Sequence, residues 1–158
     1  YGIDGSLQQT TISATQPELP TSGLRGLIAR KKKEEFTALL NDLSALAKSY
    51  GKLSPEKMQH FMTSAMISTE KTSQQSLIRL QSRDVLHPGD TMIIWIDAAT
   101  RRQRKIEIQT TLENNPVRIV SEFQDLLNGP TYMARSLVDY PSQELAITTE
   151  NFEYTRKQ

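Results

Sequence analysis

The second half of the chain, from about residue 76 to residue 154, constrains the fold most. Short runs rich in β-branched and aromatic residues alternate there with turn signals, and the gaps between the runs are too short to hold a helix. Strands joined in this way pair with their neighbours in sequence, so the pattern predicts an antiparallel meander of about six strands. One face of such a sheet must be covered, and the segment before it is the candidate cover.

The predicted strands differ in how many of their faces are apolar. Residues 91–97 read Met-Ile-Ile-Trp-Ile in their centre, which predicts a strand buried on both faces. Residues 105–112 alternate between polar and apolar side chains, which predicts a strand with one solvated face. We therefore expect Trp95 to lie beneath the covering helices, in the core or in the wall of a cavity. Turn signals divide the strands at residues 87–90, 98–102, 114–116, 128–129 and 141–143.

Two amphipathic helices are predicted before the strands, at about residues 29–50 and 55–67. In the first, apolar side chains recur every three or four residues up to Tyr50, and Gly51 ends the helix. Ser54 is a good N-cap for the second helix, and Pro55 suits its first position. The short link predicts a helical hairpin, and the polar residues 68–75 predict a loop. The fold expected is α+β, with the hairpin packed on a curled meander; a small closed barrel with the helices outside is the alternative.

Length and composition fit one domain. The 158 residues are enough to bury a core without disulfides or a metal. Residues 1–21 are polar and linker-like, so we expect an extended arm followed by a single domain over residues 22–158. In an exported protein the arm could tether the domain to a membrane anchor. Because the chain begins with Tyr1 rather than methionine, we expect a processed or trimmed product.

Composition excludes several kinds of chemistry. The absence of cysteine excludes a disulfide scaffold, a thiolate nucleophile and a Cys-ligated zinc site. The two histidines, His60 and His87, have no partner at metal-ligand spacing. Ser54 and Lys57 have Ser-x-x-Lys spacing, but Ser54 is better used as a helix cap. We therefore expect a protein that is not an enzyme, with no catalytic residue, no metal and no cofactor, and no apolar run is long enough to span a membrane.

Two basic runs, residues 30–33 and 101–105, are candidate anion contacts. The second lies at a predicted hairpin tip, where Arg101, Arg102 and Arg104 would meet an anionic group. The net charge of +1 gives no general attraction to nucleic acid, and no exposed aromatic residues beside the runs are evident to stack bases. No nucleic-acid partner is expected, and ordinary solvated charge is the alternative for both runs.

The second predicted helix offers a candidate ligand site. Met58, Phe61, Met62 and Met66 share its apolar face, and together with Trp95 they would line a space between helices and sheet. Methionine packs adaptably against varied apolar ligands. The alternative is that these side chains are simply core.

The layout of helices followed by a long meander, with Trp95-Ile96-Asp97 before a basic hairpin at residues 101–106, resembles the periplasmic lipoprotein-carrier family. That family includes the outer-membrane lipoprotein-sorting proteins. The resemblance implies a half-barrel lidded by helices, a cavity for acyl chains and a periplasmic or secreted bacterial protein. The expected function is binding of a lipid or other apolar ligand between helices and sheet. The alternative is a structural or protein-interaction module that uses a sheet edge or the basic hairpin.

Overall fold

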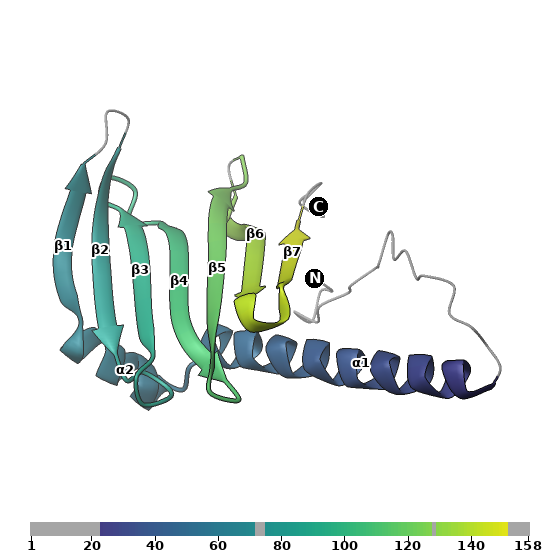
Figure 1. Ribbon diagram of the computed structural model, residues 1–158. Helices are drawn as coiled ribbons and strands as arrows, with labels where there is room; N and C mark the ends of the chain where they lie inside the picture. Colours follow the sequence, from purple (N-terminus) through teal and green to yellow (C-terminus); the bar gives the residue numbers. More distant parts are fainter. Residues whose placement is uncertain (1–22, 72–74, 128, 152–158) are drawn as a thin grey trace. The chain divides into compact units, whose positions relative to one another are not determined.

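The computed structural model describes residues 23–71, 75–127 and 129–151, which form two helices followed by a seven-stranded sheet (Figure 1). The strands pair in chain order, and every pair is antiparallel. The predicted α+β fold, with a helical segment before an antiparallel meander, is confirmed. The elements are α1 (Gly23–Gly51), α2 (Pro55–Ser64), β1 (Met66–Lys71), β2 (Ser76–Arg83), β3 (Thr91–Asp97), β4 (Gln103–Leu112), β5 (Asn115–Asp125), β6 (Thr131–Tyr140), the 3-10 turn η1 (Pro141–Gln143) and β7 (Leu145–Glu150). The predicted arm over residues 1–21 lies outside the described residues.

Local sequence signals account for most element boundaries. The Ser54 side chain accepts a hydrogen bond from the Lys57 backbone N–H at 3.3 Å, and Pro55 opens α2 as predicted. In the turn before β3, Gly89 has a φ of 85° and the Asp90 N–H donates to the His87 carbonyl at 3.2 Å. These values match the predicted type II turn, whose third residue requires a positive φ.

The meander has one strand more than the sequence predicts. Residues 66–71 form β1, which pairs with β2 in unbroken register from Met66 opposite Gln81 to Lys71 opposite Ser76. The prediction that the second helix reaches residue 67, followed by a polar loop, is therefore wrong. α2 ends at Ser64 because Ala65 already has extended backbone angles. The polar segment becomes a strand because β2 offers it a hydrogen-bonding edge, which overrides its weak local preference.

The chain divides into two compact units, Tyr1–Asn41 and Asp42–Gln158, so the boundary falls inside α1. The described part of the first unit is helical from Gly23, and its surface carries the ion pairs Arg30–Glu34 and Lys31–Glu35, each spaced by four residues. The second unit contains the last turns of α1, residues 42–51, together with α2 and the sheet.

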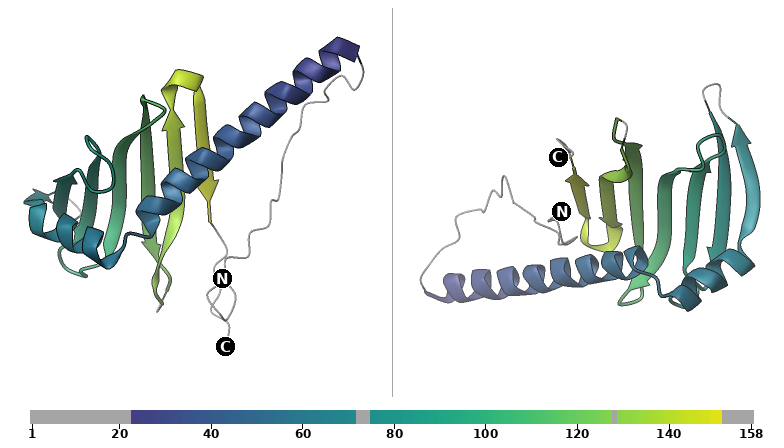
Figure 2. Two further views of the ribbon diagram at one scale, coloured as in Figure 1. Left: turned by 90° about the horizontal axis from the view of Figure 1, so that it is seen from below. Right: turned by 180° about the vertical axis from the view of Figure 1, so that it is seen from behind.

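Within the second unit, α2 runs onward from residues 42–51 in all the views of Figures 1 and 2. The short link through Lys52 therefore joins the two helices end to end instead of folding them into the expected antiparallel hairpin. β1 and β7 are the outermost strands and do not pair with each other, so the sheet is open and the closed-barrel alternative is wrong.

The core of the second unit lies between its helices and one side of the sheet, here called the helix-facing side. A cross-strand row on this side runs from β2 to β7, and the Ser64 Oγ of α2 lies 2.7 Å from the Ser82 Oγ at the β2 end of that row. From the helices, Leu43, Tyr50 and Phe61 are buried. The row consists of Ser82, Met92, Ile108, Ile119, Val138 and Ile147, and all but Ile147 are buried.

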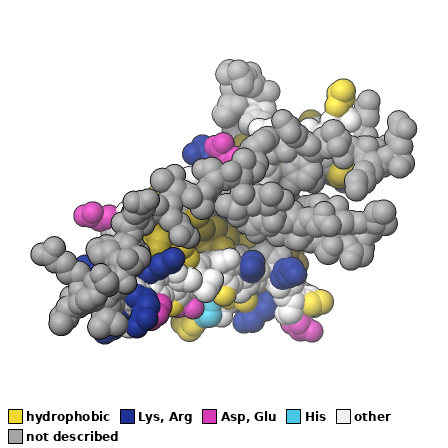
Figure 3. Space-filling view, turned by 90° about the vertical axis from the view of Figure 1, so that its right-hand side faces the viewer, with side chains coloured by type: hydrophobic (Ala, Val, Ile, Leu, Met, Phe, Trp, Pro, Cys, Tyr) yellow, Lys and Arg dark blue, Asp and Glu magenta, His cyan; other side chains and the backbone are white. Residues whose placement is uncertain are grey.

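The other side of the sheet, the outer side, is mainly polar and charged. Its buried apolar residues include Ile93 and Val120, so the prediction that the strand over residues 91–97 is buried on both faces is correct at Ile93. Figure 3 shows the molecule from the right-hand side of Figure 1, with hydrophobic side chains near the middle of the described surface and charged side chains around them.

Candidate functional site

The four residues predicted to form one apolar face of the second helix are divided between core and surface. Phe61 is fully buried, whereas Met58 is 40% exposed and Met62 is 54% exposed. Met66 belongs to β1 rather than to α2, and it is 64% exposed. Only Phe61 therefore contributes to the packing between helices and sheet as expected.

Trp95 lies on the outer side, so the prediction that it lies beneath the helices is wrong. In β3 it alternates with Ile94 and Ile96, whose cross-strand partners Leu80 and Ile78 are on the helix-facing side. The structure therefore does not bring Trp95 together with the methionines of α2. Because both faces of the strand are apolar in sequence, the pattern alone could not decide which face the helices cover.

Long charged side chains surround Trp95 in place of a hydrophobic core. The Lys105 Nζ lies 4.6 Å from the indole centroid, and the guanidinium carbon of Arg79 lies 5.8 Å from it. The indole Nε1 donates to Glu70 at 3.1 Å, and the same carboxylate pairs with Arg79 at 3.4 Å. These contacts link β1 to β2, β3 and β4 on the outer side of the sheet.

The surface around β1 combines a strand edge that pairs with no other described strand with exposed apolar side chains, and we call it the edge surface. All six residues of β1 are exposed, and Ile67 is 71% exposed. Four of the six large hydrophobic side chains that are exposed in the described chain belong to β1 or to the helix before it: Met58 and Met62 in α2, and Met66 and Ile67 in β1, where they lie on opposite sides of the sheet. Edge strands usually carry a proline, a bulge or a central lysine that discourages pairing. β1 has no proline and no bulge, and its lysine is the last residue.

The predicted basic hairpin is largely neutralised by its own carboxylates. Arg102 lies 3.1 Å from one Asp125 oxygen, and Arg104 lies 2.8 Å from the other. Arg104 also lies 3.7 Å from Asp97. Among the described residues only Arg101, of the three candidate contacts, has no ion pair. The hairpin thus presents one unpaired arginine rather than a basic patch.

Glu107 is the centre of a second ion-pair cluster on the outer side. Its carboxylate lies 3.0 Å from the Arg118 Nε and 3.0 Å from the Lys105 Nζ. The hydrogen bond from Arg118 is the main cause that lowers the pKa of Glu107 to about 2; it outweighs the opposing effect of burial, and Lys105 adds to it.

We expect Glu107→Gln to flatten the dependence of stability on pH in acid. The glutamate of the unfolded chain titrates near pH 4.3. The contribution of charged Glu107 to the free energy of unfolding is therefore complete above that pH, and it is lost as pH falls toward about 2. The variant should lose about 1 kcal/mol at pH 7 and show a shallower slope between those values. Urea denaturation at a series of pH values measures both effects. Glu122→Gln, on the same side with no ion pair among the described residues, is the control, and equal slopes for wild type and Glu107→Gln would contradict the prediction.

A buried polar cluster ties the end of α1 to the sheet. Asp90 is 1% exposed, and it accepts hydrogen bonds from the Tyr50 hydroxyl at 2.6 Å and from the backbone N–H groups of residues 85–87 at 2.7 to 2.9 Å. The Tyr50 hydroxyl also lies 3.0 Å from the Thr110 Oγ1. Burial, then the bond to Asp90, raise the pKa of Tyr50 well above its usual value. The sequence assigned Asp90 only to a turn, because its side-chain partner Tyr50 lies 40 residues away along the chain.

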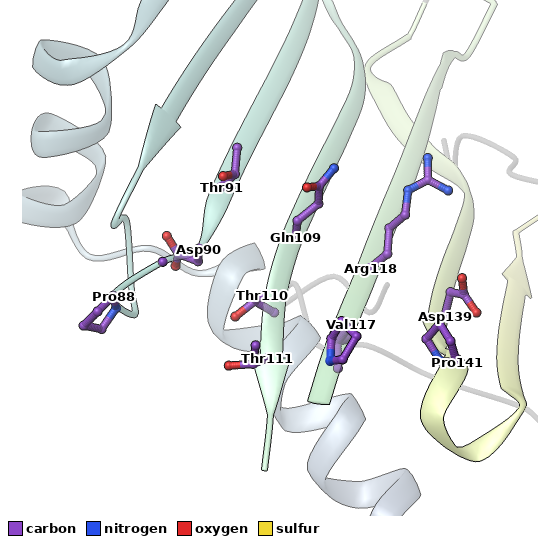
Figure 4. Close-up of a pocket in the computed structure, with 12 residues that line it drawn as sticks. Pro88, Asp90, Thr91, Gln109, Thr110, Thr111, Val117, Arg118, Asp139 and Pro141 are labelled. Carbon is purple, nitrogen blue, oxygen red and sulfur yellow. The ribbon is translucent and has the colours of Figure 1, made fainter. Parts of the chain in front are cut away.

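A pocket of about 390 Å³ opens at the same end of the sheet (Figure 4). Four of its polar residues form one cross-strand row on the outer side, Thr91, Gln109, Arg118 and Asp139, and its lining also includes Asp90, Thr110 and Thr111. Its apolar wall includes Pro88, Pro116 and Pro141, each from a different connection or strand end. Sequence reasoning did not find this pocket, because its residues come from separate segments that share no local motif.

Within the described residues, no cluster of three or more His, Cys, Asp or Glu side chains could hold a metal ion. No described helix is long and apolar enough to cross a membrane. No protein-family model, curated protein or solved structure matches the chain. Its function must therefore be inferred from its own geometry.

Proposed function

We propose that this protein is an interaction module that accepts an extended segment of a partner protein along the free edge of β1. The observation that carries the proposal is the edge surface, where an unbroken and exposed strand lies beside exposed methionines and Ile67. In strand addition the main-chain hydrogen bonds supply affinity, and alternate side chains supply specificity. An apolar surface beside an open edge is the combination that such binding requires.

The edge surface also favours a particular kind of partner segment. Ile67 and Thr69 lie on the helix-facing side of β1, and Met66 and Ser68 lie on the outer side. A partner strand with apolar side chains at alternate positions would cover Ile67 and extend the apolar surface toward α2. Methionines such as Met62 can adapt to different apolar side chains, so the sequence of the partner need not be strictly fixed.

Buried side chains support this interaction module over a lipid carrier. The region where the helices meet the sheet is occupied by Leu43, Tyr50 and Phe61, all buried. The three methionines expected to line a cavity, Met58, Met62 and Met66, are exposed instead. Lipid or acyl-chain binding and a periplasmic or secreted location stay predictions from the sequence.

Ile67→Lys should abolish partner binding without unfolding the protein. Ile67 is the second residue of β1, and a lysine inside an edge strand disfavours strand addition because its charge would be placed against the partner's apolar side chains. Because the Ile67 side chain is 71% exposed, its replacement removes little packing from the folded protein, so we expect little loss of stability. The measurement is quantitative affinity capture from extracts of the expressing cells, followed by hydrogen exchange of β1 amides with the captured partner added. We expect at least a tenfold loss of capture and, for wild type, slower exchange in β1.

Thr149→Lys is the matched control. Thr149 lies at the opposite edge of the sheet, in the same cross-strand row as Ile67, and it is also exposed. Capture that is lost equally in both variants, or retained in both, would rule out β1 as the docking edge. A partner whose addition leaves β1 exchange unchanged would also overturn the proposal. Sedimentation analysis shows separately whether a second copy of this chain is the partner.

A further inference from the structure

The pocket of Figure 4 is lined by two residues of opposite charge that do not pair with each other, and the Arg118 guanidinium extends along β5 away from Asp139. Arg118 and Asp139 are direct cross-strand partners in β5 and β6, an arrangement that commonly produces an ion pair. Instead, the Arg118 Nε donates to Glu107 at 3.0 Å. Within the described residues no hydrogen bond or ion pair reaches the Asp139 carboxylate. Asp139 acts on Arg118 only as a more distant charge, which contributes less than Glu107 to the raised pKa of Arg118.

Both groups therefore keep hydrogen-bonding capacity toward the pocket. A guanidinium has five N–H donors, and the Nη groups of Arg118 have no hydrogen bond among the described residues. Asp139 can accept several hydrogen bonds from a bound ligand. On the other side of Arg118 in the same row, Gln109 donates through Nε2 to Glu107 at 3.4 Å and keeps its carbonyl oxygen as an acceptor.

The pocket is a half-open hollow with the volume of a small-molecule site. Its volume of about 390 Å³ lies within the range of about 300 to 1,000 Å³ that is typical of ligand pockets. Pro88, Pro116 and Pro141 contribute to its lining. Proline rings form rigid apolar surfaces whose nitrogens carry no N–H group that would need a partner.

The charges of the pocket decide which ligands fit it. Arg118 is already paired with Glu107, so a simple anion would be attracted to it only weakly and would be repelled by Asp139, whereas a simple cation would be attracted by Asp139 and repelled by Arg118. A molecule that carries both charges satisfies both residues. The two side chains come from neighbouring strands on the same side of the sheet, so one small molecule with both charges can reach both of them. We infer that this pocket binds a free α-amino acid with an apolar side chain, its carboxylate on Arg118, its ammonium on Asp139 and its side chain against the prolines.

The test compares three probes that share one apolar side chain. L-leucine carries both charges, L-leucinamide lacks the carboxylate, and 4-methylpentanoate lacks the ammonium. Binding is measured by calorimetry and by amide chemical-shift titration of the full chain at neutral pH. We expect L-leucine to shift the amides of Gln109, Arg118 and Asp139, and each single-charge probe to bind at least tenfold more weakly.

Asp139→Asn supplies the variant test, because it removes the charge with little change in shape. We expect it to weaken L-leucine at least tenfold and to leave 4-methylpentanoate unweakened. Glu144→Gln is the control, since Glu144 is exposed beside η1 and does not line the pocket. The inference fails if 10 mM L-leucine shifts no pocket amide, if either single-charge probe binds as tightly as L-leucine, or if folded Asp139→Asn binds L-leucine like wild type. If the variant does not fold, the comparison of the three probes on wild type decides alone.

Discussion

Asp90→Ala is expected to lower the free energy of unfolding by about 3 to 5 kcal/mol. The carboxylate is 1% exposed, and its removal leaves the N–H groups of residues 85–87 and the Tyr50 hydroxyl without their acceptor. Unsatisfied buried donors are more costly than the bonds themselves are stabilising, because these donors have lost their water. Urea denaturation followed by Trp95 fluorescence and by circular dichroism measures the loss.

Asp84→Ala is the control for Asp90→Ala. Asp84 lies in the same connection and accepts one hydrogen bond from the Gly89 N–H at 2.6 Å, but it is exposed. Its loss should lower the stability by about 1 kcal/mol or less. If Asp90→Ala were no more destabilising than Asp84→Ala, the buried cluster would not hold α1 on the sheet.

The same cluster has a pH dependence. Burial alone would raise the pKa of Asp90, but the hydrogen bonds from Tyr50 and the backbone outweigh it, so the pKa lies below its usual value. The stabilisation is therefore complete above the unfolded value of about 3.9 and is lost as pH falls through the lower folded value. In the Asp90→Ala variant this part of the acid dependence should be absent.

Phe61→Ala is expected to destabilise the second unit by about 3 to 5 kcal/mol. The ring is fully buried where α2 packs on the sheet, and alanine would leave a cavity that the surrounding residues fill only partly. Loss of the Phe61 ring should also weaken the packing of α2 on the sheet, next to the edge surface. Chemical denaturation measures the effect.

Met62→Ala, at the next position along α2, is the matched control. Met62 is 54% exposed, so the change should alter stability by no more than about 0.5 kcal/mol. An effect as large as that of Phe61→Ala would mean that Met62 belongs to the core. It would then be unavailable as part of the edge surface, and the proposed docking site would lose one of its main apolar groups.

Several parts of the fold follow from patterns within a few residues. The alternation of Ile106, Ile108 and Thr110 predicts a strand with these residues on one face, and all three lie on the helix-facing side. Ser54 and Pro55 predict the start of α2, and Pro88 with Gly89 predicts the turn before β3. These signals work because capping bonds, turn angles and strand alternation are set by adjacent backbone atoms.

The candidate site was less predictable for an identifiable reason. The sequence selected Met58, Met62 and Met66, with Phe61, as one apolar face, but the three methionines are exposed side chains of α2 and β1 rather than a cavity lining. An apolar stripe on a short helix has the same appearance whether a sheet covers all of it or only the part around Phe61. Burial is decided by the partner surface, which the stripe itself does not encode.

By itself, the sequence determined the α+β class, the order of helices before an antiparallel meander, and most of the turns. Only the tertiary structure decided that residues 66–71 join the sheet as β1, that Trp95 lies on the outer side, and that Asp90 and Asp139 differ so strongly in their bonding. Each of these outcomes depends on residues brought together from distant parts of the chain. Local periodicity fixes which residues share a face of one strand, but the neighbouring elements fix which face is buried and which charges find a partner.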